Sequence, residues 1–175
     1  MLGLFVDDMF IIGHVISLIG GVKDLLHSRF KIKDLGAATF LLGMGIRRLA
    51  GGDVQLSQEQ YLGEVLLRFP VDSPQEASTP LPPGCKLSQA DFPQSEEEAK
   101  KMALIPYYSA IGSLMYLAVC TRPDIAAAVS SLSRFNGNPG MAHLEGVQHV
   151  LSYLQGTSGE GLLQEGRVDK VVGLL

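Results

Sequence analysis

The stretch LGLFVDDMFIIG, residues 2–13, places two short apolar runs on either side of two adjacent aspartates, Asp7 and Asp8. Apolar runs separated by turn-forming residues are typical of paired strands, and aspartate is common in turns because its side chain caps nearby backbone groups. We therefore predict a β-hairpin with Asp7 and Asp8 at its turn. On this pattern alone, a solvated turn and a carboxylate site for metal ions both remain open.

The sequence after the hairpin predicts helices and further short strands. Apolar residues recur at close to helical spacing over residues 17–30, and short β-like runs separated by glycines extend to residue 56. Ser57 is a suitable N-cap for a helix that ends before Pro70. Prolines and glycines then bound three predicted helices. These helices cover residues 107–120, 123–135 and 139–154. The fold class predicted is α+β.

Charge is distributed unevenly along the chain. The net charge is −4, which is unusual for a protein that binds nucleic acid. Six basic and two acidic residues lie between residues 22 and 48, whereas nine acidic and three basic residues lie between residues 49 and 100. Residues 72–101 also hold five prolines, so this acidic part is predicted to be an extended connector or a surface loop.

The composition indicates an intracellular protein without a disulfide framework. No apolar run approaches the roughly 20 residues that a membrane-spanning helix needs, and no basic region precedes the first apolar run. Cys85 and Cys120 lack metal-ligand spacing, so two free thiols are expected. His143 and His149 do not share a helix face as a metal-binding pair would. The choice between cytoplasm and nucleus stays open.

Adjacent aspartates at an apolar hairpin suit a two-metal phosphoryl-transfer site, because carboxylates hold the Mg²⁺ ions that stabilise the attacking and leaving oxygens. FVDD at residues 5–8 resembles the catalytic hairpin of reverse transcriptases, in which an aromatic residue and a variable residue precede two aspartates. Further stretches are similar to the copia-type retrotransposon enzymes and stand in the same order. They are KDLG (33–36), FLLGMGI (40–46), LSQEQY (56–61), STPL (78–81), YSAIGSLMYLAVCTRPDIAAAV (108–129), NPG with a following histidine (138–143) and YLQGT (153–157).

The resemblance implies a partial reverse-transcriptase palm, made of the hairpin, a helix and short strands, followed by a helical thumb-like unit. Residues 1–57 would be the C-terminal half of the palm, with the catalytic hairpin and the primer grip. Residues 58–105 would be a helix and a proline-rich acidic connector, and residues 106–157 the thumb-like unit. Residues 158–175 would be the truncated start of the connection towards ribonuclease H.

The resemblance also implies the site residues. Asp7 and Asp8 would be the catalytic residues and the metal ligands. Leu42, Gly43 and Met44 fall at the primer grip, a β-turn that holds the primer end near the metals; an ordinary apolar strand bent at Gly43 is the alternative. The remaining nucleic-acid contacts would come from two arginines, of which alternation along a strand lets only one reach the phosphate, and from a helix along the primer-template, for which plain packing is the alternative. They are Arg47, Arg48, Gly112, Ser113 and Tyr116.

The function implied is that of a fragment of an RNA-directed DNA polymerase, with Mg²⁺ as the cofactor of the intact parent. Its partners would be an RNA or DNA primer-template and the remaining Pol segments, namely fingers, ribonuclease H and integrase, with no membrane. The chain begins close to its FVDD stretch, so a third carboxylate and the nucleotide-binding fingers are not expected in it, and the fragment alone is expected to be inactive. A decayed remnant and a non-catalytic nucleic-acid-binding module are the alternatives.

Overall fold

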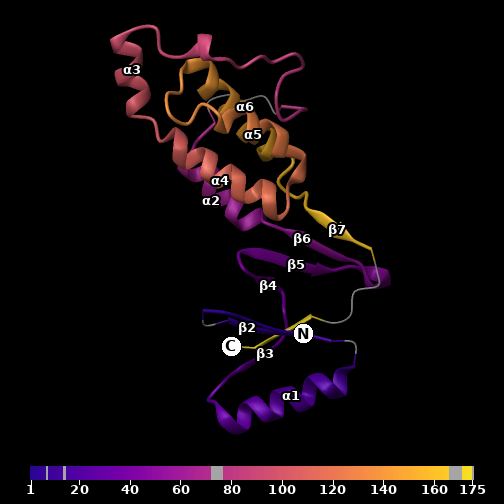
Figure 1. Cartoon of the computed structure of the whole chain (residues 1–175). Helices are drawn as coiled ribbons and strands as arrows, with labels where there is room; N and C mark the ends of the chain where they lie inside the picture. Colours follow the sequence, from indigo (N-terminus) through magenta and orange to yellow (C-terminus); the bar gives the residue numbers. More distant parts are fainter. Residues whose placement is uncertain (7, 14, 72–76, 166–170, 175) are drawn as a thin grey trace. The chain divides into compact units, whose positions relative to one another are not determined.

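The computed structural model describes residues 1–6, 8–13, 15–71, 77–165 and 171–174 (Figure 1). The chain divides into two compact units. The first unit contains residues 1–56 and 163–175, and the second contains residues 57–162. Helices and antiparallel strands are both present, so the predicted α+β class is confirmed.

The first unit holds a four-stranded sheet in the order β1-β2-β8-β3. Its strands are β1 (Leu2–Phe5), β2 (Asp8–Ile12), β3 (Asp34–Ala37) and β8 (Val171–Leu174). The β8 strand lies antiparallel to both of its neighbours, with Met9 opposite Leu174 on one side and Ala37 opposite Val172 on the other. The last residues described, 171–174, are therefore an inner strand of this sheet.

Helix α1 (Ile16–Arg29) packs on this sheet through a small apolar cluster. Ile11 of β2 and Ile19 of α1 are buried, and Met9 and Leu26 pack against them. The ammonium group of Lys23 lies 2.6 Å from the Asp34 carboxylate, which ties α1 to β3. The predicted helix over residues 17–30 is confirmed to within one residue at each end.

Four further strands form a second sheet in the order β4-β5-β6-β7. They are β4 (Phe40–Leu41), β5 (Met44–Arg48), β6 (Val54–Ser57) and β7 (Leu162–Gln164). The strands β4 and β5 form a hairpin in which Leu41 is opposite Met44. Only two residues, Leu42 and Gly43, connect them.

The second unit is helical and contains the main apolar core. Its helices are α2 (Glu59–Arg68), α3 (Glu96–Ala103), α4 (Tyr107–Cys120), α5 (Ala126–Ser133) and α6 (Met141–Gly156), with short 3-10 turns at Gln89–Asp91 and Pro123–Ile125. Leu114 of α4, Val129 of α5 and Val150 of α6 have no measurable exposure to solvent. Figure 1 shows α4, α5 and α6 side by side.

Between α2 and α4, residues 96–103 form helix α3, where the sequence predicted an extended connector or a surface loop. Its acidic run forms the first turn of α3, where the Ser95 hydroxyl accepts a hydrogen bond from the backbone N–H of Glu98 at 3.1 Å. Carboxylates in the first turn stabilise a helix because they face its exposed N–H groups. Leu81 and Leu87 pack against the main core, so α2 and this segment fold within the second unit.

The start of α2 also differs from the prediction. Ser57 is the last residue of β6, and the helix begins at Glu59 without a side-chain cap. Gln58 turns inward instead, and its amide oxygen accepts a hydrogen bond of 2.8 Å from the Thr121 hydroxyl. Both side chains are buried, so a tertiary contact between α2 and α4 takes the place of the predicted local cap.

Within the described part of the chain, no single helix combines the length and the apolar character needed to cross a membrane. The bent pair α3 and α4 meets the two criteria only when both helices are counted together.

Candidate functional site

The FVDD stretch forms the predicted hairpin. Phe5 at the end of β1 pairs with Asp8 at the start of β2, so Asp8 belongs to the strand and not to the turn, where the sequence predicted it. Val6 has a φ of +52°, in the left-handed region that branched side chains avoid. Asp8 thus stands at the first position of β2, directly after the turn. Asp7 lies outside the described residues.

The LGM stretch forms a second tight hairpin turn. Leu42 has a φ of +50° and Gly43 a φ of +75°. Two-residue hairpin turns that match the twist of the strands require positive φ at both positions, which glycine adopts freely and leucine does not. The sequence left a turn and a bent strand open here, and the structure shows the turn.

Val6 and Leu42 are the two non-glycine residues with positive φ in the described chain. Each stands at the tip of a hairpin to which the sequence assigned a role. A left-handed conformation costs an ordinary residue about 1–2 kcal/mol. Such strained conformations cluster at functional sites, where the surrounding structure holds them in place.

The two arginines of β5 have different surroundings. Ile46 is buried, and Arg48, two residues along the strand, donates a hydrogen bond of 2.7 Å to the carbonyl oxygen of Ala38. Arg47 points to the opposite face because side chains alternate along a strand. Its side chain is exposed and forms no ion pair with any residue that the structure describes. Of the two, Arg47 is the one available to an incoming phosphate.

The three predicted contacts on α4 are not all on one face. Ser113 is 6% exposed and faces the core of the second unit. Gly112 is exposed, and a side chain added there would meet no atom within 4 Å. The Tyr116 ring is 37% exposed and stands edge-on to Tyr61, with 5.0 Å between the ring centroids. Gly112 and Tyr116 therefore form the accessible part of this prediction.

The donor chemistry at the first hairpin fits a hard divalent cation, because aspartate carboxylates are the oxygen ligands that Mg²⁺ prefers. Asp8 stands at the start of β2, and Asp7 precedes it in the sequence. Across the ranges that the structure describes, no group of three histidine, cysteine, aspartate or glutamate side chains is arranged to hold a metal ion. A complete site here needs Asp7 together with at least one further ligand.

Comparison with known proteins agrees with these motifs. The family described as "Reverse transcriptase (RNA-dependent DNA polymerase)" matches residues 1–83, which include both hairpins. The Pol polyprotein of transposon TNT 1-94 from Nicotiana tabacum is 49% identical over 160 residues, or 91% of this chain. These matches support a fragment of a retrotransposon reverse transcriptase, with relatives among copia-type transposons. They agree with the family that the ordered motifs indicated.

Other relatives of this reverse transcriptase chain come from plants and yeast. The Pol polyprotein of transposon RE1 from Arabidopsis thaliana is 34% identical over 91% of the chain, and a putative transposon Ty5-1 protein of Saccharomyces cerevisiae is 31% identical over 89%. The chain spans 12% and 10% of the two Pol polyproteins and 49% of the yeast protein. No solved structure matches the chain.

One copia-type stretch, TRPD at residues 121–124, has a structural role that the sequence only partly indicated. The Arg122 side chain is buried, and its guanidinium donates hydrogen bonds to Asp124 at 2.8 Å and to the backbone oxygen of Thr157 at 2.9 Å. The Tyr153 hydroxyl donates to the same carboxylate at 2.8 Å. Arg122 thereby fastens the end of α6 to the turn before α5. The Arg-Pro-Asp spacing was the available signal for this clamp.

The NPG motif and its following histidine form a helix cap. The backbone N–H of Gly140 donates to Nδ1 of His143 at 2.9 Å, at the start of α6. The His143 ring is fully buried and stacks on Phe135 with 4.0 Å between centroids. His149 instead contacts the carbonyl oxygen of Thr79 at 3.0 Å. The two histidines therefore serve the packing of α6.

The buried imidazole predicts acid sensitivity of the second unit. Burial lowers the pKa of His143 below its ordinary value of 6.5, outweighing the opposite effects of the Ser88 backbone and the Asp91 carboxylate. Between the lowered folded pKa and the unfolded pKa of about 6.5, the unfolded chain binds more protons than the folded one. The free energy of unfolding is therefore at its full value above about pH 6.5 and falls as the pH drops through the folded pKa. Urea denaturation between pH 7.5 and about 5 measures this loss.

The matched variant for this prediction is His143→Gln. A glutamine at the third helical position can still accept the N-cap hydrogen bond but does not titrate. We expect its unfolding free energy to change less between pH 7.5 and about 5 than that of the unchanged chain. Equal pH slopes for the two proteins would contradict the assignment to His143.

Proposed function

We propose that this chain carries the catalytic hairpin and the primer grip of an RNA-directed DNA polymerase that acts in the intact Pol polyprotein. The observation that carries the proposal is the pair of strained turns, at Val6 and Leu42. The left-handed conformations of Val6 and Leu42 both lower the stability of the fold. Strained conformations of this kind are retained where function needs the geometry. The match of residues 1–83 to the reverse transcriptase family supports the same activity.

In this proposal Asp7 and Asp8 hold Mg²⁺, which would stabilise charge on the reacting phosphoryl group when bound. The β2 strand positions the backbone of Asp8, and further ligands would come from other parts of the polyprotein. The Leu42–Met44 turn supports the end of the primer, and Arg47 contacts its backbone phosphate. Positioning of this kind supplies most of the catalysis in phosphoryl transfer, because little covalent chemistry falls to the protein.

The remaining Pol segments, fingers, ribonuclease H and integrase, are the proposed protein partners, and an RNA or DNA primer-template is the proposed substrate. The surface of the first unit supports a protein partner. Leu4, Phe5, Leu18 and Leu25 are all more than half exposed, at 69%, 56%, 68% and 60%. Exposed apolar side chains in such number mark surfaces that other protein covers.

Leu42→Gly separates stability from function and tests the primer grip. Glycine removes the strain of the left-handed conformation, and its extra flexibility when unfolded offsets part of that gain. The backbone N–H of Ile46 donates a hydrogen bond to the carbonyl oxygen of Thr39. We expect the free energy of opening of this amide, measured by hydrogen exchange, to be unchanged or raised by up to about 1 kcal/mol. Primer affinity of the intact polyprotein is expected to fall, because the exposed side chain is lost.

Leu49→Gly is the matched control for that test. Leu49 is exposed to nearly the same extent as Leu42, at 39% against 36%, but it has an ordinary φ of −100°. Glycine there relieves no strain and should lower the protection by about 0.5–1 kcal/mol. The proposed grip is wrong if Leu42→Gly leaves primer affinity and extension by the polyprotein intact.

A further inference from the structure

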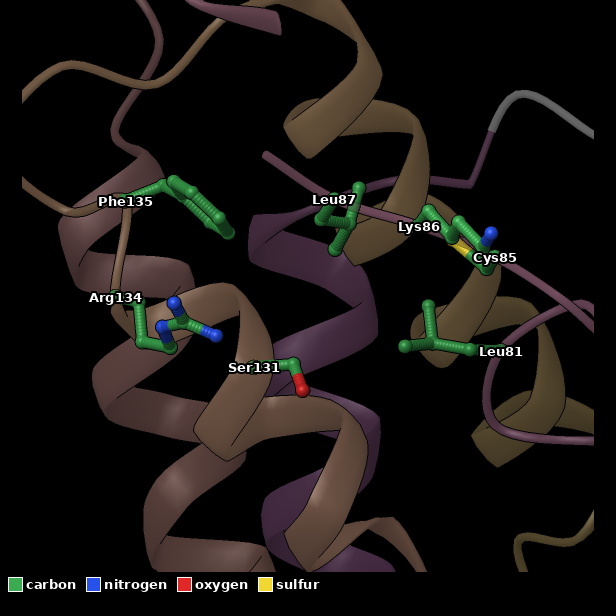
Figure 2. A pocket seen from close by; sticks show the side chains of 7 residues that line it. All are labelled: Leu81, Cys85, Lys86, Leu87, Ser131, Arg134 and Phe135. Carbon is green, nitrogen blue, oxygen red and sulfur yellow. The ribbon is translucent and has the colours of Figure 1, made fainter. Parts of the chain in front are cut away.

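A pocket in the second unit has no role in the proposed polymerase chemistry. It has a volume of about 240 Å³ and lies between the segment before Ser88 and the end of α5. Figure 2 shows Arg134 and Phe135 on one side of it, Cys85 and Lys86 on the other, and Leu87 and Ser131 between them. The lining residues are Leu81, Cys85, Lys86, Leu87, Ser131, Arg134 and Phe135.

The apolar part of the lining is held in place by the core. Leu81 and Leu87 are partly buried and pack against the main apolar cluster. Phe135 is 4% exposed, and its stack on the buried His143 ring fixes its orientation. An apolar ligand would therefore meet a preformed surface, and binding would not require side chains to be ordered first.

The polar part of the lining consists of donors. Arg134 and Lys86 are exposed cations, and the pocket has no carboxylate in its lining. Neither cation forms an ion pair with any part of the chain that the structure describes, although the chain as a whole is acidic. The Arg134 guanidinium carbon lies 5.8 Å from the centroid of the Phe135 ring, which keeps this charge at the apolar wall.

We propose that this pocket binds a small anion with an apolar body, of which a carboxylate with a short alkyl chain is the simplest member. The guanidinium of Arg134 and the hydroxyl of Ser131 receive the anionic head, and Leu81 and Leu87 cover the chain. Pockets for drug-sized ligands measure roughly 300–1,000 Å³, so a smaller molecule suits this one. Lys86 at the rim adds a weaker, longer-range attraction.

The test is a titration of the full chain with hexanoate, followed by two-dimensional NMR of the backbone amides. We expect saturable shifts confined to residues 81–87 and 131–135, with a dissociation constant on the order of 1 mM, as a ligand of this size allows. Hexan-1-ol and hexylammonium share the alkyl chain but lack the negative charge. We expect both to bind at least about threefold more weakly, since they lose the charge-assisted hydrogen bond.

Two variants locate the anion, and a third is the control. Arg134→Gln should weaken hexanoate binding about three- to tenfold, since a neutral amide replaces the charged donor. Ser131→Leu should abolish the shifts by filling the pocket, while the unperturbed spectrum elsewhere reports that it folds. Lys101→Gln removes an exposed charge on α3, away from the lining, and should bind normally.

Three results would overturn the proposal. The first is equal affinity for hexanoate and hexan-1-ol, which would mean that the charge has no part. The second is an equal loss in Arg134→Gln and Lys101→Gln, which would indicate general attraction to a cationic surface. The third is a set of shifts outside residues 81–87 and 131–135. Because the pocket and the aspartate hairpin lie in different units, none of these results bears on the proposed polymerase activity.

Discussion

An intact Pol polyprotein with Asp7→Asn and Asp8→Asn is expected to lose primer extension by about a thousandfold or more, since metal ligands supply several kcal/mol of transition-state stabilisation. Asparagine has nearly the shape of aspartate but carries no charge. The hairpin should therefore keep its register, in which Phe5 is opposite Asp8, while the affinity for the divalent cation falls. The measurement is primer extension with Mg²⁺ and with Mn²⁺, using each single variant and the pair.

Asp24→Asn is the matched control for the aspartate variants. Asp24 lies on α1, in the same unit, and its side chain is exposed. The same loss of one charge at that position should leave extension within about twofold, because single surface substitutions have small effects. Full extension by the Asp7→Asn, Asp8→Asn protein would show that the hairpin does not hold the catalytic metal. An equal loss in Asp24→Asn would point to net charge instead.

The hairpin and the helices were predictable because their signals are local. The pairing of β1 with β2 follows from two apolar runs around a polar pair, and α4 begins and ends at the predicted Tyr107 and Cys120. Pro106 precedes that helix and fixes its start. The acidic run of α3 carried a local signal too, since Ser95 followed by three glutamates is a good helix start. The prolines around it outweighed that signal in the prediction.

The parts that were not predictable depend on contacts between distant residues. The start of α2 is set by the buried hydrogen bond between Gln58 and Thr121, which no local sequence pattern predicts. The β8 strand is a short apolar run whose two partners, β2 and β3, lie far away in the sequence. In the candidate site, Arg47 and Arg48 have the same residue type, so the sequence suggested both equally as the contact to a phosphate. Only the buried Ile46 and the bond from Arg48 to Ala38 distinguish them.

Asp124→Asn is expected to lower the unfolding free energy of the second unit by about 3 kcal/mol, the lower end of the cost of breaking a buried ion pair. The Arg122 side chain is only 4% exposed, so its charge would lose its partner without gaining water. The carboxylate itself is 35% exposed, which places the effect at the lower end. Urea denaturation followed by the helical circular dichroism signal measures it.

The pH dependence of the same pair supplies a second measurement. Burial raises the pKa of Asp124, but the hydrogen bonds from Arg122 and Tyr153 outweigh burial and hold the pKa below its ordinary value of 3.8. The folded state then binds fewer protons than the unfolded one, so the contribution is present above about pH 4 and is lost as the pH falls through the folded pKa. This acid-induced loss should be absent from Asp124→Asn.

The exposed pair Lys100 and Glu96 is the control for the buried one. Their side chains are 73% and 82% exposed, so Glu96→Gln should change stability by less than about 1 kcal/mol. The double variant Arg122→Met, Asp124→Asn removes both charges and should recover part of the loss, because no unpaired charge stays buried. Equal effects of Asp124→Asn and Glu96→Gln would contradict the clamp.

The place of β8 in its sheet has a consequence for protein synthesis. A ribosome releases the β1–β2 hairpin first and the strand that joins β2 to β3 only after the whole helical unit has emerged. Non-local pairing of this kind is slow, because the intervening chain must lose entropy by closing into a loop before any stabilising contact forms. Until then the β2 edge lacks the β8 strand that pairs with it here, and an unpaired strand edge is a surface that chaperones bind.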